Sequence, residues 1–267
     1  METASLSFKV VDDLGLAAER MRLPASPTGD RKYCANAMGP FLEAYHLINE
    51  GLLPRDVANR WISTGSQGEL AAALRADKSA WASEGGKTGL LRGVYDNDIA
   101  PWHQFARQAK SAAIEAGLPS AWAAEMVAAL GEIRSNFEEH SGAAETGIAL
   151  FHSRTGIFEF VVADRGMGVL ASLSSAAEYR DLKSHGDALR LTLTEGASRF
   201  GFQAGRGFGF RPLFVGLANR RAILRFRSGN AALEIDGASP TLMTARISER
   251  PTLRGFFVSV TCHAEAA

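Results

Sequence analysis

The stretch IFEFVVADRGMG, residues 157–168, passes from an apolar run directly into an acidic, glycine-containing turn. Residues 157–163 carry so few polar side chains that we expect a central strand, buried on both faces of a sheet. Asp164 follows this strand, and Gly166 and Gly168 leave room for a ligand beside the backbone. A carboxylate in this position is suited to accept a hydrogen bond from an exocyclic amine such as that of adenine. An ordinary strand-to-loop turn fits the same residues, so the neighbouring segments must decide.

The segment before this strand predicts a long helix over residues 120–140, followed by a first hairpin strand at 147–152. Large apolar residues recur along the helix at steps of four, three and four, which forms one stripe against a core. The residues of the stripe are Met126, Leu130, Ile133 and Phe137. Glu132, Asn136 and His140 are spaced by four beside it, so we expect them at the rim of a buried pocket. The polar flank of an ordinary helix is the alternative.

A glycine-rich box follows two short predicted helices, 172–179 and 185–192. It reads GRGFG, residues 205–209, and precedes a predicted helix at 212–219, so its amides and the helix N-terminus are suited to bind phosphate. The residues concerned are Gly205, Arg206, Gly207, Phe208 and Gly209. Because glycine is common in this chain, such a pattern arises by chance in roughly one of four similar sequences. Its weight therefore comes from its order among the other motifs. Strands are expected after it at 222–227, 232–235, 243–247 and 255–262.

The ordered set of an ExxxNxxxH helix, a hairpin, DxGxG, short helices, GxGxG, a helix and strands resembles the histidine-kinase-like, or GHKL, ATPases. This group includes histidine kinases, anti-sigma-factor kinases, gyrase-type topoisomerases, MutL-type repair proteins and heat-shock chaperones. The resemblance covers about residues 96–262, and the helix pair at 98–117 and 120–140 looks most like the anti-sigma-factor and STAS-paired branch. It implies a Bergerat fold, an α/β two-layer sandwich with a mixed sheet covered by helices.

The resemblance also implies roles for the motif residues and a cofactor, ATP with Mg²⁺. Asn136 corresponds to the Mg²⁺ ligand and, with His140, belongs to the family's helical motif, while Asp164 corresponds to the residue that contacts adenine. Glu132 corresponds to the group that activates the attacking water in members that hydrolyse ATP, although a structural role is equally open. A late threonine of the family contacts the adenine-linked water. Thr252 is the candidate here, although it follows Pro251 where the family usually has glycine.

Residues 1–95 are expected to form a smaller, mainly helical region for partner binding or dimerisation, before an ATPase domain at 96–267. Helices are predicted at 34–50 and 67–82, and the glycines of residues 85–93 indicate a loop or linker. Residues 6–11 alternate like a short strand. The family has an additional strand before its first helix, and either residues 6–11 or residues 90–94 can supply it.

The composition favours a cytoplasmic protein whose partners are neither nucleic acid nor membrane. Lys and Arg (29) balance Asp and Glu (29), so there is no overall field of one sign. Cys34 and Cys262 have no metal-ligand or redox spacing, which fits idle thiols in a reducing compartment better than a disulfide. No stretch has the length and apolar character of a membrane span.

Two functions follow from the resemblance. The first is an ATPase or an ATP-dependent serine/threonine- or histidine-type protein kinase in bacterial signalling, acting on a STAS-like or sigma-type regulator, with a homodimer as a further expectation. The second is an ATP-gated protein-binding module without significant catalysis. His46 and His103 are not followed by an acidic residue, so we do not expect them to be phosphoacceptors.

Overall fold

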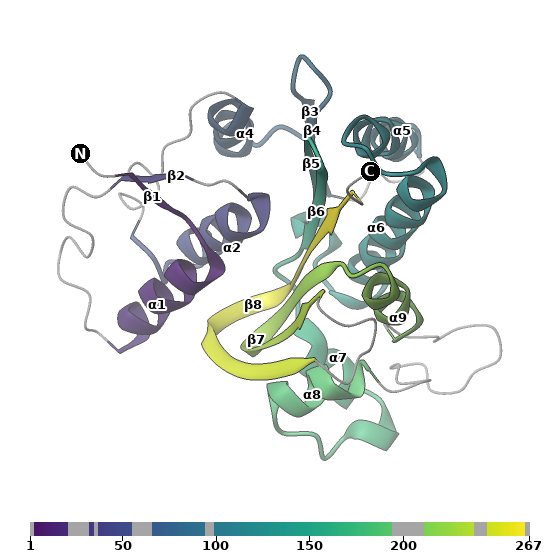
Figure 1. Ribbon diagram of the computed structural model, residues 1–267. Coiled ribbons are helices and arrows are strands. Elements are labelled where there is room, and N and C mark those ends of the chain that lie inside the picture. Colours follow the sequence, from purple (N-terminus) through teal and green to yellow (C-terminus); the bar gives the residue numbers. More distant parts are fainter. Residues whose placement is uncertain are drawn as a thin grey trace.

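The computed structural model describes residues 3–20, 32–34, 37–54, 66–93, 99–193, 211–237 and 245–264. An open six-stranded sheet runs through the middle of the molecule in the order β3-β4-β5-β6-β8-β7 (Figure 1). Every neighbouring pair in this sheet is antiparallel, so the expected mixed sheet was wrong at the level of strand direction. The class is nevertheless α/β, as expected.

The strands of this sheet are β3 (Ala80–Ala82), β4 (Thr88–Arg92), β5 (Ile148–Arg154), β6 (Ile157–Ala163), β7 (Ile223–Asp236) and β8 (Arg246–His263). A separate parallel pair joins β1 (Thr3–Ser5) to β2 (Lys32–Cys34). The helices are α1 (Phe8–Glu19), α2 (Met38–Asn49), α4 (Ser66–Arg75), α5 (Ala100–Glu115), α6 (Ser120–His140), α7 (Gly168–Ser174), α8 (His185–Leu191) and α9 (Arg211–Asn219). Two 3-10 turns are η1 (Ala144–Thr146) and η2 (Ala177–Tyr179).

One face of the sheet is covered by α5 and α6, with α7, α8 and α9 toward the β7 edge (Figure 1). The helix predicted at 120–140 is confirmed as α6, because its stripe from Met126 to Phe137 is buried in this layer. Phe160 and Val162 of β6 point into the same cluster. Phenylalanine rings pack edge to face or tilted through it, among them Phe214 of α9 against Phe226 of β7.

The opposite face is covered by α1, α2 and α4, so the sheet lies between two helical layers rather than in a two-layer sandwich (Figure 1). Val161 and Ala163, which alternate with Phe160 and Val162 along β6, are buried on this side. Strand β6 therefore has both faces buried and two neighbours in the sheet, which confirms the central strand inferred from its apolar sequence.

Three predictions for the first 95 residues were wrong. The segment 6–11 belongs mainly to α1, because Ser7 caps the helix by accepting a hydrogen bond from Val10 N at 3.4 Å and the apolar spacing continues helically to Leu14. The expected linker at 85–93 contains the buried strand β4, whereas residues 80–82, expected as helix, form β3. Of the two segments considered for a strand before the helix pair, residues 90–94 overlap β4, whereas residues 6–11 overlap α1.

The expected division at residue 95 does not separate two hydrophobic cores. Strands β3 and β4 lie before it but belong to the six-stranded sheet, and α1 and α2 pack on β6 and β8. The sheet that crosses residue 95 therefore makes independent folding of residues 96–267 unfavourable. Among the helices of the described ranges, none combines the length and the apolar character that a membrane crossing requires.

Candidate functional site

Asp164 directly follows β6, and its buried carboxylate has one oxygen without a hydrogen-bond partner. Its side chain belongs to a residue that is 1 % exposed, and its backbone N–H donates to Phe256 O at 3.0 Å. Oδ1 accepts a hydrogen bond from Gly166 N at 2.6 Å, while Oδ2 is buried without a hydrogen-bond partner. Burial raises the pKa of Asp164 to about 7, although the backbone groups of Gly166 and Phe256 beside the carboxylate lower it. A buried acceptor without a donor is costly unless a ligand supplies one.

Gly255 brings backbone close to this carboxylate, and Gly168 packs against Gly255 in turn. Gly255 has φ +75°, and a Cβ on it would stand 2.5 Å from Asp164 Oδ1. Gly168 has φ +76°, and a Cβ there would stand 2.9 Å from Gly255 O and 2.7 Å from Ser228 Oγ. Both glycines therefore have a positive φ that larger residues rarely adopt, and neither has room for a side chain. Gly168 was expected from the sequence, whereas Gly255 was not.

Ser228 of β7 ties three elements of the site together. Its hydroxyl donates to Gly255 O at 2.8 Å and accepts from Val169 N at 2.9 Å, at the start of α7. This residue was missed because a lone serine within a strand carries no signal in sequence. Only the pairing of β7 with β8 places it beside Gly168 and Gly255.

The turn after Asp164 is attached to the C-terminal end of α6. Met167 N donates to Ser141 O at 2.8 Å, and Gly166 lies so close to Ser141 that a Cβ would overlap its backbone. Arg165 N donates to Thr146 Oγ1 at 2.9 Å. The structure therefore brings the DRGMG turn to the helix end that carries His140.

The polar row along α6 is more open than expected. Glu132 is exposed rather than at the rim of a buried pocket, and Asn136 and His140 are half-buried. Asn136 Nδ2 donates to Glu132 O at 2.8 Å, one turn earlier, which leaves the amide oxygen of Asn136 available. Among the described residues, there is no group of three or more His, Cys, Asp or Glu side chains that could hold a metal ion.

The remaining predicted residues do not join this group. The glycine-rich box, Gly205, Arg206, Gly207, Phe208 and Gly209, lies outside the described residues. Thr252 is exposed on β8, and its N–H donates to the Glu19 carboxylate of α1 at 2.5 Å. These contacts place Thr252 with the N-terminal helices. The residue of β8 that contacts the Asp164 backbone is instead Phe256, through its carbonyl.

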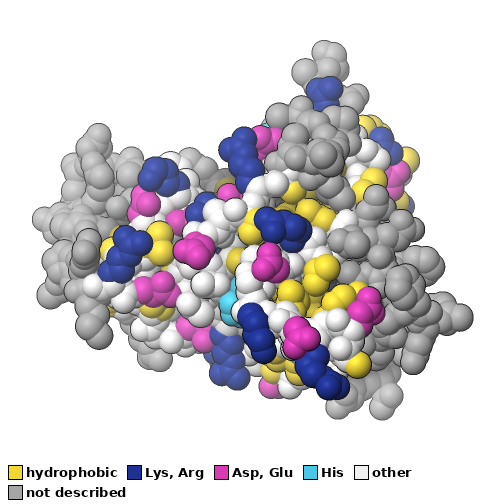
Figure 2. All heavy atoms as spheres, turned by 90° about the horizontal axis from the view of Figure 1, so that it is seen from below, with side chains coloured by type: hydrophobic (Ala, Val, Ile, Leu, Met, Phe, Trp, Pro, Cys, Tyr) yellow, Lys and Arg dark blue, Asp and Glu magenta, His cyan; other side chains and the backbone are white. Residues whose placement is uncertain are grey.

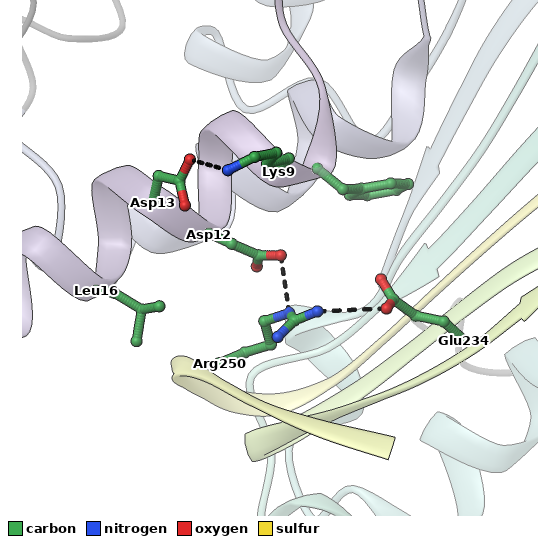
Figure 3. Close-up of a pocket in the computed structure, with 7 residues that line it drawn as sticks. Lys9, Asp12, Asp13, Leu16, Glu234 and Arg250 are labelled. Carbon is green, nitrogen blue, oxygen red and sulfur yellow. Dashed lines mark hydrogen bonds and ion pairs between the residues drawn. The ribbon is translucent and has the colours of Figure 1, made fainter. Parts of the chain in front are cut away.

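A hollow of about 410 Å³ opens elsewhere, between α1 and the outer part of the sheet (Figure 3). Its charged groups already pair with one another: Lys9 Nζ with Asp13 Oδ2 at 2.8 Å, and Arg250 Nε with Asp12 Oδ2 at 2.8 Å. Because these charges already pair with one another, the hollow offers a ligand little binding energy beyond what water obtains there. We therefore place the candidate site at Asp164, where a buried acceptor has no donor.

Beneath this hollow, a buried ion network fastens α1 and α2 to the sheet. Arg225 binds Glu43 through two hydrogen bonds of 2.8 and 2.9 Å and contacts Asp12 at 2.5 Å. Arg227 pairs with Glu43 and donates to Pro251 O. Burial favours a raised pKa for Glu43, but the two arginines outweigh it and lower that pKa. Glu43 is therefore ionised in the folded protein and binds both arginines as a charge.

Figure 2 shows basic and acidic side chains interspersed over the described part of one face, without a field of one sign there.

Cys262 is a buried free thiol 3.1 Å from Met126 Sδ. Burial raises its pKa to about 12, so it behaves as the idle thiol expected. No family model matches this chain, and no curated protein matches it in sequence.

Proposed function

We propose that the Asp164 site binds the adenine of ATP, and that the protein is an ATP- and Mg²⁺-binding signalling protein of the histidine-kinase-like kind. The observation that carries this is the buried Asp164 Oδ2, an acceptor with no hydrogen-bond partner beside a wall of glycine backbone. An exocyclic amine would satisfy that oxygen while Gly166 N continues to hold Oδ1. The order of the three sequence motifs supports the same ligand.

The residues present are compatible with Mg²⁺ held mainly by the nucleotide. Mg²⁺ prefers oxygen ligands and commonly takes only one or two from the protein, the others coming from phosphate and water. Asn136 can offer its amide oxygen to the metal, because its Nδ2 group is bound to Glu132 O. When bound, the metal would supply charge compensation for the phosphates. Asn136→Ala is expected to reduce the Mg²⁺ dependence of nucleotide binding.

Two outputs fit such a site. In the first, Glu132 acts as the base of an ATPase, or assists transfer to a STAS-like or sigma-type partner, as the resemblance implies. In the second, ATP only changes which conformation binds a partner. The exposure of Glu132 favours the second in the ligand-free protein, since nothing in its described surroundings orients the carboxylate.

Calorimetric titration with ATP and Mg²⁺ tests the binding proposal. We expect binding in the micromolar to sub-millimolar range for the wild type and none for Asp164→Asn, because the amide NH₂ opposes the adenine amine. Asp13→Asn is the matched control, as Asp13 is exposed and pairs only with Lys9 in the described contacts. At 100 times its dissociation constant, ATP should also stabilise the fold by about 2.7 kcal/mol. Absence of both effects in the wild type rules out the nucleotide function.

A further inference from the structure

Strand β8 departs twice from regular pairing with β7. Gly229 pairs with Leu253, whereas Ala231 pairs with Glu249 and Ser228 pairs with Phe256. Residues 250–252 thus oppose a single residue of β7, and residues 254–255 oppose none. We call these the outer bulge and the inner bulge. Bulges bend a strand and redirect its groups, and they occur often beside functional sites.

The outer bulge is held by α1. Thr252 N donates to Glu19 at 2.5 Å. Arg250 Nε pairs with Asp12 at 2.8 Å (Figure 3). Gly15 lies so close to Pro251 that a Cβ on Gly15 would stand 2.7 Å from the Pro251 Cβ. Three turns of α1 therefore fix where the outer bulge lies.

The inner bulge forms one wall of the acceptor site. Gly255 adopts φ +75° against the Asp164 backbone and Oδ1, and Ser228 Oγ holds Gly255 O at 2.8 Å. The position of Gly255 thus determines the space around the carboxylate. A shift of this residue would move the group that Asp164 presents to a ligand.

Leu253 alone separates the two bulges, and it is fully buried in the cluster beneath α1 and α2. Packed interiors transmit displacement because they contain little free volume. A movement of the outer bulge therefore passes through Leu253 to Gly255 instead of being absorbed between them.

We propose that α1 is a regulatory element of the Asp164 site, coupled to it through the two bulges of β8. This inference rests on the proposed nucleotide function. Docked α1 holds the acceptor geometry, and displacement of α1 weakens nucleotide binding. By linkage, a bound nucleotide strengthens the docking of α1 by the same factor.

Two variants displace α1 in different ways. Gly15→Ala places a methyl group against Pro251 while improving the intrinsic helix propensity of α1, so the helix itself is not weakened. Glu19→Ala removes the acceptor of Thr252 N from an exposed position and carries the test if Gly15→Ala fails to fold. Asp13→Ala is the control, because the pair that Asp13 makes is with Lys9 on the same helix and not with a residue of the bulge.

Hydrogen exchange of the Gly166 amide in the full, nucleotide-free chain reports on the Asp164 site, and calorimetry with MgATP reports on affinity. We expect both displacing variants to accelerate exchange at Gly166 and to weaken MgATP binding by about fivefold or more, with Asp13→Ala unchanged in both. Faster exchange at Thr252 with Gly166 and affinity unchanged overturns the coupling. Faster exchange at Gly166 in a protein that binds no MgATP supports the coupling and refutes the nucleotide function alone.

Discussion

Arg225 of β7 donates two hydrogen bonds, of 2.8 and 2.9 Å, to the carboxylate of Glu43 of α2, although 182 residues separate the two in the chain. Both side chains are buried, at 2 % and 0 % exposure, and Arg227 reaches the same carboxylate. Removing one partner from a buried pair leaves uncompensated charge, which is far more damaging than the loss of a surface pair. The N-terminal helices are thus part of what keeps the sheet folded.

Glu43→Gln tests this role. We expect it to reduce the free energy of unfolding by about 3–5 kcal/mol, because two buried arginines lose their shared counter-charge. Denaturant unfolding followed by circular dichroism measures the change. Lys9→Ala breaks the exposed pair with Asp13 and should cost no more than about 1 kcal/mol. Equal effects of the two substitutions would contradict a stabilising buried network.

Truncation to residues 88–267 is expected to yield an aggregated product. It removes Asp12 and Glu43, deletes β3, and uncovers the apolar face that includes Val161 and Phe257. Size-exclusion chromatography with MgATP titration checks this. A monomeric truncated protein that binds MgATP would instead show that residues 1–95 are a separate unit.

We expect the protonation of Asp164 to contribute to the change of the free energy of unfolding with pH. Its folded-state pKa of about 7 lies above the ordinary aspartate value, so the folded state binds the extra proton between about pH 4 and pH 7. The contribution of Asp164 to stability is therefore full at low pH and is lost as pH rises through 7. Burial raises the pKa of Glu159 to about 7 as well, so the measurement is the difference between wild type and Asp164→Asn across this range. A difference that does not change with pH would exclude the raised pKa.

Nucleotide affinity should change with pH in the opposite sense, because the ionised carboxylate is the better acceptor for an adenine amine. We expect MgATP binding to strengthen as pH rises toward 7 and to level off above it, by no more than tenfold per pH unit. Calorimetry in buffers of different ionisation enthalpy would detect the accompanying proton release below pH 7. Binding without proton release at pH 6 would mean that Asp164 does not meet the ligand as a carboxylate.

Glu132→Gln separates the two proposed outputs. If Glu132 is a base, the variant should retain MgATP binding and lose about 10²–10⁴-fold in hydrolysis or transfer, since that is the typical contribution of a positioned base. Glu139→Gln, at another exposed position of α6, is the control. Turnover equal to wild type, measured by phosphate release with and without a partner, would favour the ATP-gated binding module.

Local sequence patterns determined the parts of this protein whose cause is local. The apolar run before Asp164 predicted a central strand because both faces of that strand are buried. The stripe from Met126 to Phe137 predicted α6 because its 3.6-residue periodicity persists over about three turns. The sequence also identified Asp164 as a candidate site residue, because its carboxylate directly follows a buried apolar strand. Short windows failed: the alternation at 6–11 was too brief to reveal α1.

Only the tertiary structure decided what surrounds that carboxylate. Gly255 reaches Asp164, and Ser228 holds Gly255, because β8 pairs with both β6 and β7 and has two bulges, and no pattern within either strand records that register. Likewise, no local pattern distinguishes Glu43, and only the packing of α2 on β6 and β8 brings its carboxylate to the buried guanidinium groups of Arg225 and Arg227. Long-range pairing places charges and backbone in a common space, and that placement depends on the whole fold.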